Sequence, residues 1–99
     1  MGMIETTVDI PAEHQANVFG QFDAFAKKIE RTLHVTLIAR DDTVKILGEE
    51  TVALQAKSVL EQLTALARRG NQIQEQNVNY TLALSMEQSE GKVLEIDDD

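Results

Sequence analysis

The stretch AEHQANVFGQFDAFAKKIERTL, residues 12–33, decides the fold of this 99-residue chain. Gly20 divides it, because glycine adopts the positive-φ conformations that end helices at little steric cost. A short helix is predicted over 12–19. A second helix is predicted after Asp23, whose carboxylate can cap it by accepting hydrogen bonds from backbone amides two or three residues on. The apolar residues of this second helix recur at helical spacing: Phe25, Ala26, Ile29 and Leu33.

Three segments around this stretch have the composition of β-strands. Residues 4–10 are rich in β-branched side chains and end at Pro11. Residues 34–40 and 43–47 are apolar runs separated by Asp41-Asp42, a gap of hairpin size that favours an antiparallel pair. Together these segments predict a three-stranded antiparallel sheet.

The second half of the chain begins with its most regular helical pattern. Glu49-Glu50 suits the start of a helix and Arg68-Arg69 its end, in keeping with the helix dipole, and Gly70 stops it. The apolar stripe between them consists of Val52, Ala56, Val59, Leu60, Leu63 and Leu66 or Ala67. Residues 71–88 are ambiguous, because their apolar positions alternate as in a strand while some also lie four apart on one helical face.

Composition and charge exclude several classes of protein. The formal charge is −8, but residues 87–99 hold six acidic residues against Lys92, so the remaining 86 residues carry a net charge of only −3. The overall charge argues against a general phosphate-binding protein, although the first 86 residues are nearly balanced. The absence of cysteine excludes disulfides and thiolate chemistry and favours the reducing cytoplasm. No apolar run is long enough to span a membrane, and the run at 97–99 is expected to be solvated rather than a metal site.

The predicted order of elements, strand, helix, helix, strand, strand, helix, resembles the type I arrangement of the KH nucleic-acid-binding domain. In that fold a GxxG loop joins the first two helices. Here the loop is Gly20-Gln21-Phe22-Asp23, so an acid replaces the second glycine. The fold expected from this resemblance is α+β and KH-like, a three-stranded antiparallel sheet packed by helices.

A closer resemblance is to the N-terminal domain of PhoH-like proteins, bacterial proteins named for phosphate-starvation induction and predicted to be ATPases. The matching segments are 18–23, 29–30, 35–40, 44–48 and 60–70, the last ending in Ala-Arg-Arg-Gly. The chain departs from the family pattern at Leu33-His34, where Leu-Gly is common. The resemblance implies an extra C-terminal helix over 75–87, a KH-like domain over 1–88, and an acidic tail or start of a linker over 89–99.

In that family the ATPase machinery lies in a P-loop module that follows this domain. The chain contains no G-x-x-x-x-G-K-[ST] motif, the loop that holds ATP phosphates. We therefore expect this chain to be non-catalytic and to need no cofactor, with ATP and Mg²⁺ expected only for the missing P-loop domain. His14 and His34 lack the neighbours of a catalytic or metal site.

The resemblance places candidate nucleic-acid contacts in and just after the glycine loop. The candidate residues are Gly20, Gln21, Phe22, Lys27, Lys28 and Arg31. Asp23 opposes such binding, since a carboxylate 4 Å from a phosphate costs about 1 kcal/mol even in water. The plainer interpretation, which we favour residue by residue, is that Gly20 and Asp23 stop and cap helices and that the three cations form a solvated face balanced by Glu30.

The expected function is that of a KH-like accessory domain assisting RNA or partner recognition, with weak affinity for single-stranded RNA. The alternative is a structural or oligomerisation module that packs on the P-loop domain or on a second copy. In that case Tyr80 and Leu84 are expected to leave an uncovered apolar patch. Phe19 and Phe22 flank the glycine and fit either the core or a groove, so an exposed Phe22 is the more informative outcome.

Overall fold

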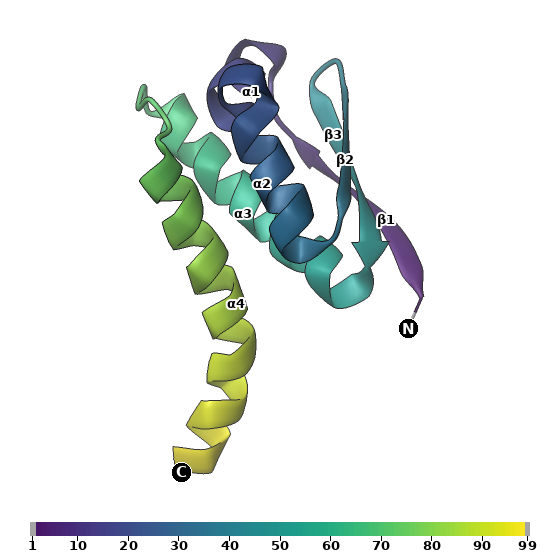
Figure 1. Ribbon diagram of the computed structural model, residues 1–99, viewed down its shortest axis with the longest axis vertical. Helices are drawn as coiled ribbons and strands as arrows, with labels where there is room; N and C mark the ends of the chain where they lie inside the picture. The colour runs from purple at the N-terminus through teal and green to yellow at the C-terminus, as the bar shows by residue number, and fades with distance from the viewer. Residues whose placement is uncertain (1, 99) are drawn as a thin grey trace.

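The computed structural model describes the backbone of residues 2–98 and the side chains of residues 2–87 (Figure 1). The elements are β1 (Met3–Asp9), α1 (Ala12–Phe19), a single 3₁₀ turn (Gln21–Asp23), α2 (Ala24–Leu33), β2 (Thr36–Arg40), β3 (Thr43–Glu49), α3 (Glu50–Arg68) and α4 (Glu75–Asp98). This order confirms the predicted α+β, KH-like arrangement with an extra C-terminal helix.

The sheet has the order β1-β3-β2, and both pairs of neighbours are antiparallel. The central strand β3 pairs through Ile46 with Thr6 on one side and with Leu37 on the other. Val44 and Ile46 of β3 are fully buried, and Thr43, Lys45 and Leu47, which alternate with them, are only partly covered. Helices therefore cover one face of the sheet (Figure 1), and β2 is left as an edge strand.

The tip of the β2–β3 hairpin also holds the start of α1. Asp41 has a φ of 48°, a conformation that aspartate tolerates better than most residues. The next residue, Asp42, accepts a hydrogen bond from the Ala12 backbone N–H at 2.8 Å through its carboxylate. Its carbonyl accepts another from the Ile10 N–H at 3.0 Å. The predicted hairpin turn thus supplies the cap that Pro11 cannot.

Helix α3 is the centre of the core, as its apolar stripe predicts. It contacts β1 and β3 on one side and α1, α2 and α4 on the others. Its buried residues are Ala53, Ala56, Val59, Leu60, Leu63, Thr64 and Ala67. Burying a Leu or Val side chain contributes roughly 1.5 to 3 kcal/mol relative to exposure, so this stripe is the main source of the cohesion between sheet and helices.

The ambiguous segment is a helix, α4, as the family resemblance implies. Val78 and Leu82 are buried against the core, while Tyr80, which a strand pattern groups with them, is 66% exposed. Thr81 and Ser85 are also buried, and their hydroxyls donate to helix carbonyls three or four residues earlier. Helix α4 runs to Asp98, past the end at residue 87 that the resemblance implies, while the side chains of residues 88–99, including the predicted acidic tail, lie outside the described part of the chain.

None of the helices that the structure describes is long and apolar enough to cross a membrane. Among residues with described side chains, no group of three or more His, Cys, Asp or Glu is placed to hold a metal ion.

Candidate nucleic-acid interface

The loop between α1 and α2 is built from residues with left-handed backbone. Gly20 has a φ of 81°, Phe22 of 57° and Asp23 of 58°. The Gly20 N–H closes α1 by donating to the Ala16 carbonyl, and the Asp23 N–H donates to the Gly20 carbonyl, each at 3.0 Å. This tight turn redirects the chain so that α2 starts as a separate helix (Figure 1).

Gly20 is required at its position for two reasons. Its φ of 81° with a ψ of 170° lies in a region that is essentially restricted to glycine. A Cβ built there would lie 2.6 Å from the Phe25 ring, closer than real Cβ contacts come. The predicted helix break at Gly20 is confirmed, and the ring of Phe25 packs against the bare backbone.

Asp23 precedes α2, as predicted, but its carboxylate makes no capping hydrogen bond. The expected role as a side-chain cap is therefore wrong. A capping residue normally has an extended backbone that directs its side chain at the amides of the first turn, whereas Asp23 is left-handed. Aspartate is one of the few residues other than glycine that tolerates this conformation, which explains how it can replace the second glycine of a GxxG loop.

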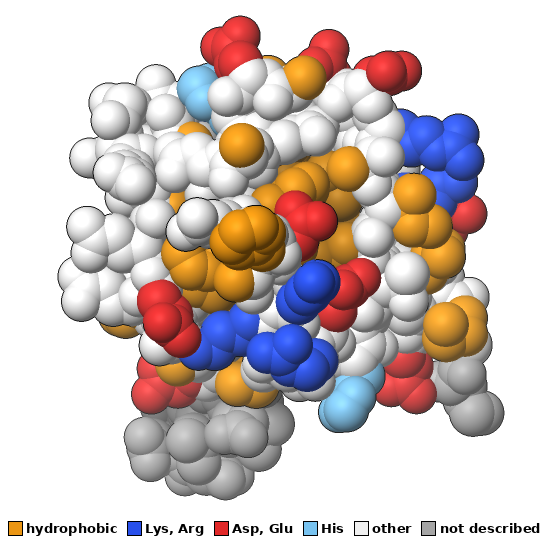
Figure 2. Space-filling model, turned by 45° about the horizontal axis from the view of Figure 1, so that its top comes forward, with side chains coloured by type: hydrophobic (Ala, Val, Ile, Leu, Met, Phe, Trp, Pro, Cys, Tyr) orange, Lys and Arg blue, Asp and Glu red, His pale blue; other side chains and the backbone are white. Residues whose placement is uncertain are grey.

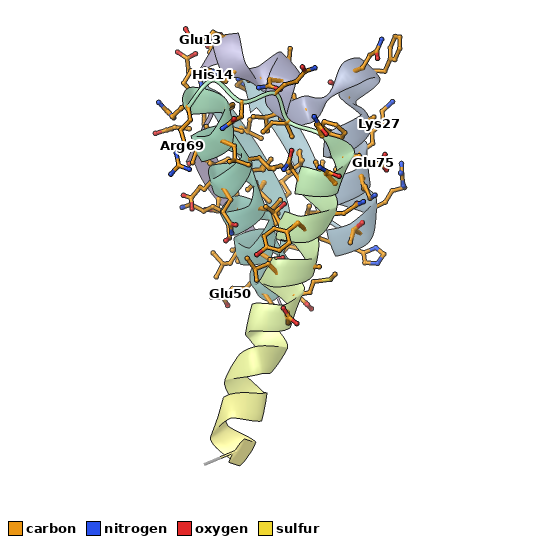
Figure 3. The ribbon with its side chains drawn as sticks, turned by 90° about the vertical axis from the view of Figure 1, so that its left-hand side faces the viewer. Glu13, His14, Lys27, Glu50, Arg69 and Glu75 are labelled. Carbon is orange, nitrogen blue, oxygen red and sulfur yellow. The ribbon has the colours of Figure 1, made fainter. Side chains whose placement is uncertain are left out.

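The three candidate cations on α2 have different surroundings. Lys27 and Arg31 are exposed one helical turn apart, and neither has an ion-pair partner among residues 2–87. The Nζ of Lys28 lies 3.2 Å from Oε2 of Glu75 at the start of α4. Figure 3 shows Glu75 there, beside the helix that carries Lys27. Two of the three candidates thus remain available for a phosphate, and the third joins α2 to α4.

Glu30 forms no ion pair with these cations among residues 2–87. Its Oε2 accepts a hydrogen bond from the Leu37 backbone N–H at 2.8 Å. Because Leu37 lies on an edge strand, this N–H points away from β3 and toward α2. N–H and C=O groups alternate sides along an antiparallel strand, so the backbone polar groups of Ala39, two residues on, face the same way.

A groove of about 160 Å³ lies between α2 and β2, next to the glycine loop. Its apolar lining consists of Phe19, Ala26, Leu37 and Ala39, and its charged lining of Asp23, Lys27 and Glu30. Figure 2 shows this face, with an exposed apolar strip across its middle, Lys and Arg side chains gathered below the strip, and carboxylates at its edges. The groove is open, with an apolar floor and three charged side chains that converge on it.

The remaining candidates lie around this groove rather than in it. Phe22 is 85% exposed, so of the two alternatives left open for it, the core is excluded. Gln21 instead lines a separate open depression of about 550 Å³ between α1 and the α3–α4 loop, together with Asn17 and Asn71. Strand β2 contributes Leu37 and Ala39 to the groove. No pattern in the sequence indicated this contribution.

Comparisons with known proteins agree with this fold. No family model matches the chain. It is 32% identical over 69 residues to a PhoH-like protein of Bacillus subtilis, an alignment covering 70% of this chain and 22% of that protein. It is 25% identical over 97 residues to a PhoH-like protein of Mycobacterium tuberculosis, covering 95% and 28%. A solved protein of unknown function from Aeropyrum pernix superposes with a TM-score of 0.70 at 16% identity, over 97% of this chain and 53% of that one.

At 16% identity the Aeropyrum structure supports the fold alone. The curated relatives indicate the family to which the chain is related: it is a distant relative of the PhoH-like proteins. It spans about a quarter of their length, 22% in Bacillus and 28% in Mycobacterium.

Proposed function

We propose that this chain is a non-catalytic accessory domain of the PhoH-like type that binds single-stranded RNA weakly through the groove between α2 and β2. The observation that carries the proposal is the combination of an open apolar groove with Lys27 and Arg31, two exposed cations free of ion pairs among residues 2–87. Proteins recognise unpaired RNA by burying splayed bases against apolar and aromatic surfaces while cations hold the phosphates.

Affinity in this proposal is low because few cations face the strand. Two neutralised phosphates give a slope of log affinity against log salt of about −1.4, small beside that of dedicated nucleic-acid binders. Asp23 lines the same groove and repels the backbone. Phe22, exposed at the loop, adds a face on which one base can stack.

The test is a titration of the ¹⁵N-labelled chain with a single-stranded RNA heptamer at low salt, followed by amide chemical shifts. We expect shifts clustered on residues 20–31 and on Leu37 and Ala39. Lys27→Ala with Arg31→Ala should abolish them, while Lys57→Ala with Arg68→Ala, which removes the same two positive charges from α3, serves as a charge-matched control. No movement at millimolar RNA would refute the proposal.

ATP hydrolysis, with its Mg²⁺, belongs in this proposal to a P-loop module in the part of the longer relatives that this chain does not span. The chain acts in the cytoplasm as a binding module beside that motor and needs no cofactor of its own. The absence of a P-loop motif from its 99 residues supports this division.

A structural or oligomerisation role is the second candidate, favoured by exposed apolar side chains on the outer helices. Tyr80 on α4 is 66% exposed, Leu54 on α3 49% and Met86 38%, while Leu84 is half-buried. Sedimentation equilibrium distinguishes the two roles. Self-association that Tyr80→Ser weakens, without any RNA binding, would favour the structural role.

A further inference from the structure

We infer that the groove between α2 and β2 selects guanine among the bases of a single strand, with Glu30 as the specificity-determining residue. This inference rests on the proposed function and names the ligand of the same site. It follows from the polar lining of the groove, in which two hydrogen-bond acceptors, Asp23 and Glu30, accompany one donor, Lys27.

Glu30 is held in a fixed position within the groove. Its Oε2 accepts the Leu37 N–H at 2.8 Å, which anchors the carboxylate against the edge strand. Within residues 2–87 the side chain has no ion pair, and this is its one hydrogen bond. An ionised carboxylate has about four lone-pair positions and no donor, so the remaining acceptor capacity of Glu30 faces a ligand that must supply N–H groups.

Guanine is the base that supplies them in the required arrangement. Its Watson–Crick edge presents two adjacent donors, N1–H and the N2 amino group, beside the O6 acceptor. Adenine and cytosine each present a single amino donor next to a ring acceptor, and uracil places its one donor between two carbonyls. A carboxylate beside an ammonium group therefore matches guanine: Glu30 accepts from N1–H and N2–H, and Lys27, whose ammonium group has three donor hydrogens, donates to O6 as well as to a neighbouring phosphate.

The size of the groove agrees with one base as the occupant. A cavity of roughly 150 Å³ accommodates a benzene ring, so this groove, at about 160 Å³ with an open mouth, takes the six-membered ring of guanine, which carries N1, N2 and O6, and leaves the five-membered ring outside. Ala26 and Ala39 line it with small side chains, which leave room for the flat face of a ring. The backbone of Ala39, directed the same way as that of Leu37, adds a donor and an acceptor at the rim.

The experiment measures the affinity of the full chain for four RNA heptamers, UUUNUUU with N as G, A, C or U, by fluorescence anisotropy at low salt. We expect the G heptamer to bind about tenfold more tightly than the other three, as for one good bidentate pair. Glu30→Gln should remove this preference, because an amide can present only one acceptor. The glutamine oxygen can still accept the Leu37 N–H, so the variant should fold, which its thermal midpoint checks.

Glu61→Gln is the matched control, since it changes the net charge equally on the exposed surface of α3 and should keep the preference for G. Equal binding of all four heptamers would overturn the guanine inference and leave RNA binding intact. A preference for G that survives in Glu30→Gln would overturn the role of Glu30. Failure of every heptamer to bind would refute the proposed function itself, and the inference with it.

Discussion

Replacing Asp23 by glycine tests whether this position requires only a residue that tolerates a left-handed backbone, or whether it requires the carboxylate. The left-handed φ of 58° costs a non-glycine residue about 1 kcal/mol, somewhat less for aspartate. Glycine removes that strain but loses roughly 0.5 to 1 kcal/mol through the greater freedom of the unfolded chain. No capping bond is lost, because the structure has none. We therefore expect the free energy of unfolding to stay within about 0.5 kcal/mol of the parent.

The same substitution removes a negative charge from the groove. A repulsion of about 1 kcal/mol at 4 Å in water corresponds to about a fivefold change in affinity, so Asp23→Gly should bind a single-stranded RNA heptamer about five times more tightly. Asp23→Asn is the control, since asparagine tolerates the same backbone while lacking the charge. Urea denaturation gives the stability and fluorescence anisotropy the affinity.

Two results would refute this reasoning. A loss of more than about 1 kcal/mol in Asp23→Gly, recovered in Asp23→Asn, would mean that the side chain stabilises the helix start after all. Unchanged RNA affinity in both variants would mean that Asp23 does not face the phosphates.

Three further substitutions probe the loop and the groove. Gly20→Ala should destabilise the fold by about 2 to 3 kcal/mol in urea denaturation, from its backbone strain and the clash with Phe25; a loss below 0.5 kcal/mol would contradict the packing described. Phe22→Asn should raise the free energy of unfolding by up to about 1 kcal/mol, since an exposed left-handed Phe gives way to a residue that tolerates that backbone, and should weaken RNA binding; unchanged binding argues against stacking. Lys27→Ala should lower the magnitude of the salt slope by about 0.7, and an unchanged slope would show that no phosphate lies there.

Local patterns were sufficient to predict most of the elements. The break at Gly20 follows from one residue's freedom in φ, and the helix after Asp23 follows from helical spacing, both of which the sequence displays directly. The long stripe ending at Gly70 predicts α3 for the same reason. The pattern of the segment that forms α4 fits both a helix and a strand. Its buried face is decided by packing against α3, and periodicity does not reveal that partner.

The candidate site was only partly predictable, because its decisive contacts join residues that no local rule connects. Helical spacing predicts that Glu30 balances the cations of its own helix, yet its carboxylate accepts a hydrogen bond from the Leu37 N–H on the next strand. Lys28 was grouped with Lys27, yet it pairs with Glu75, 47 residues away. Asp23 has the right residue type for a cap, but the tight turn after Gly20 fixes its backbone in a conformation that directs the carboxylate elsewhere.

The ion pair between Lys28 and Glu75 couples anion binding at α2 to the contact between α2 and α4. The ammonium group of Lys28 can neutralise the first carboxylate of α4 or an incoming anion, and each choice weakens the other by the same factor, as thermodynamic reciprocity requires. A solvent-exposed pair of this kind contributes about 0.5 kcal/mol, so the two equilibria influence each other about twofold. Whatever stabilises the first turn of α4 thus tunes, gently and in both directions, how strongly α2 attracts negative charge.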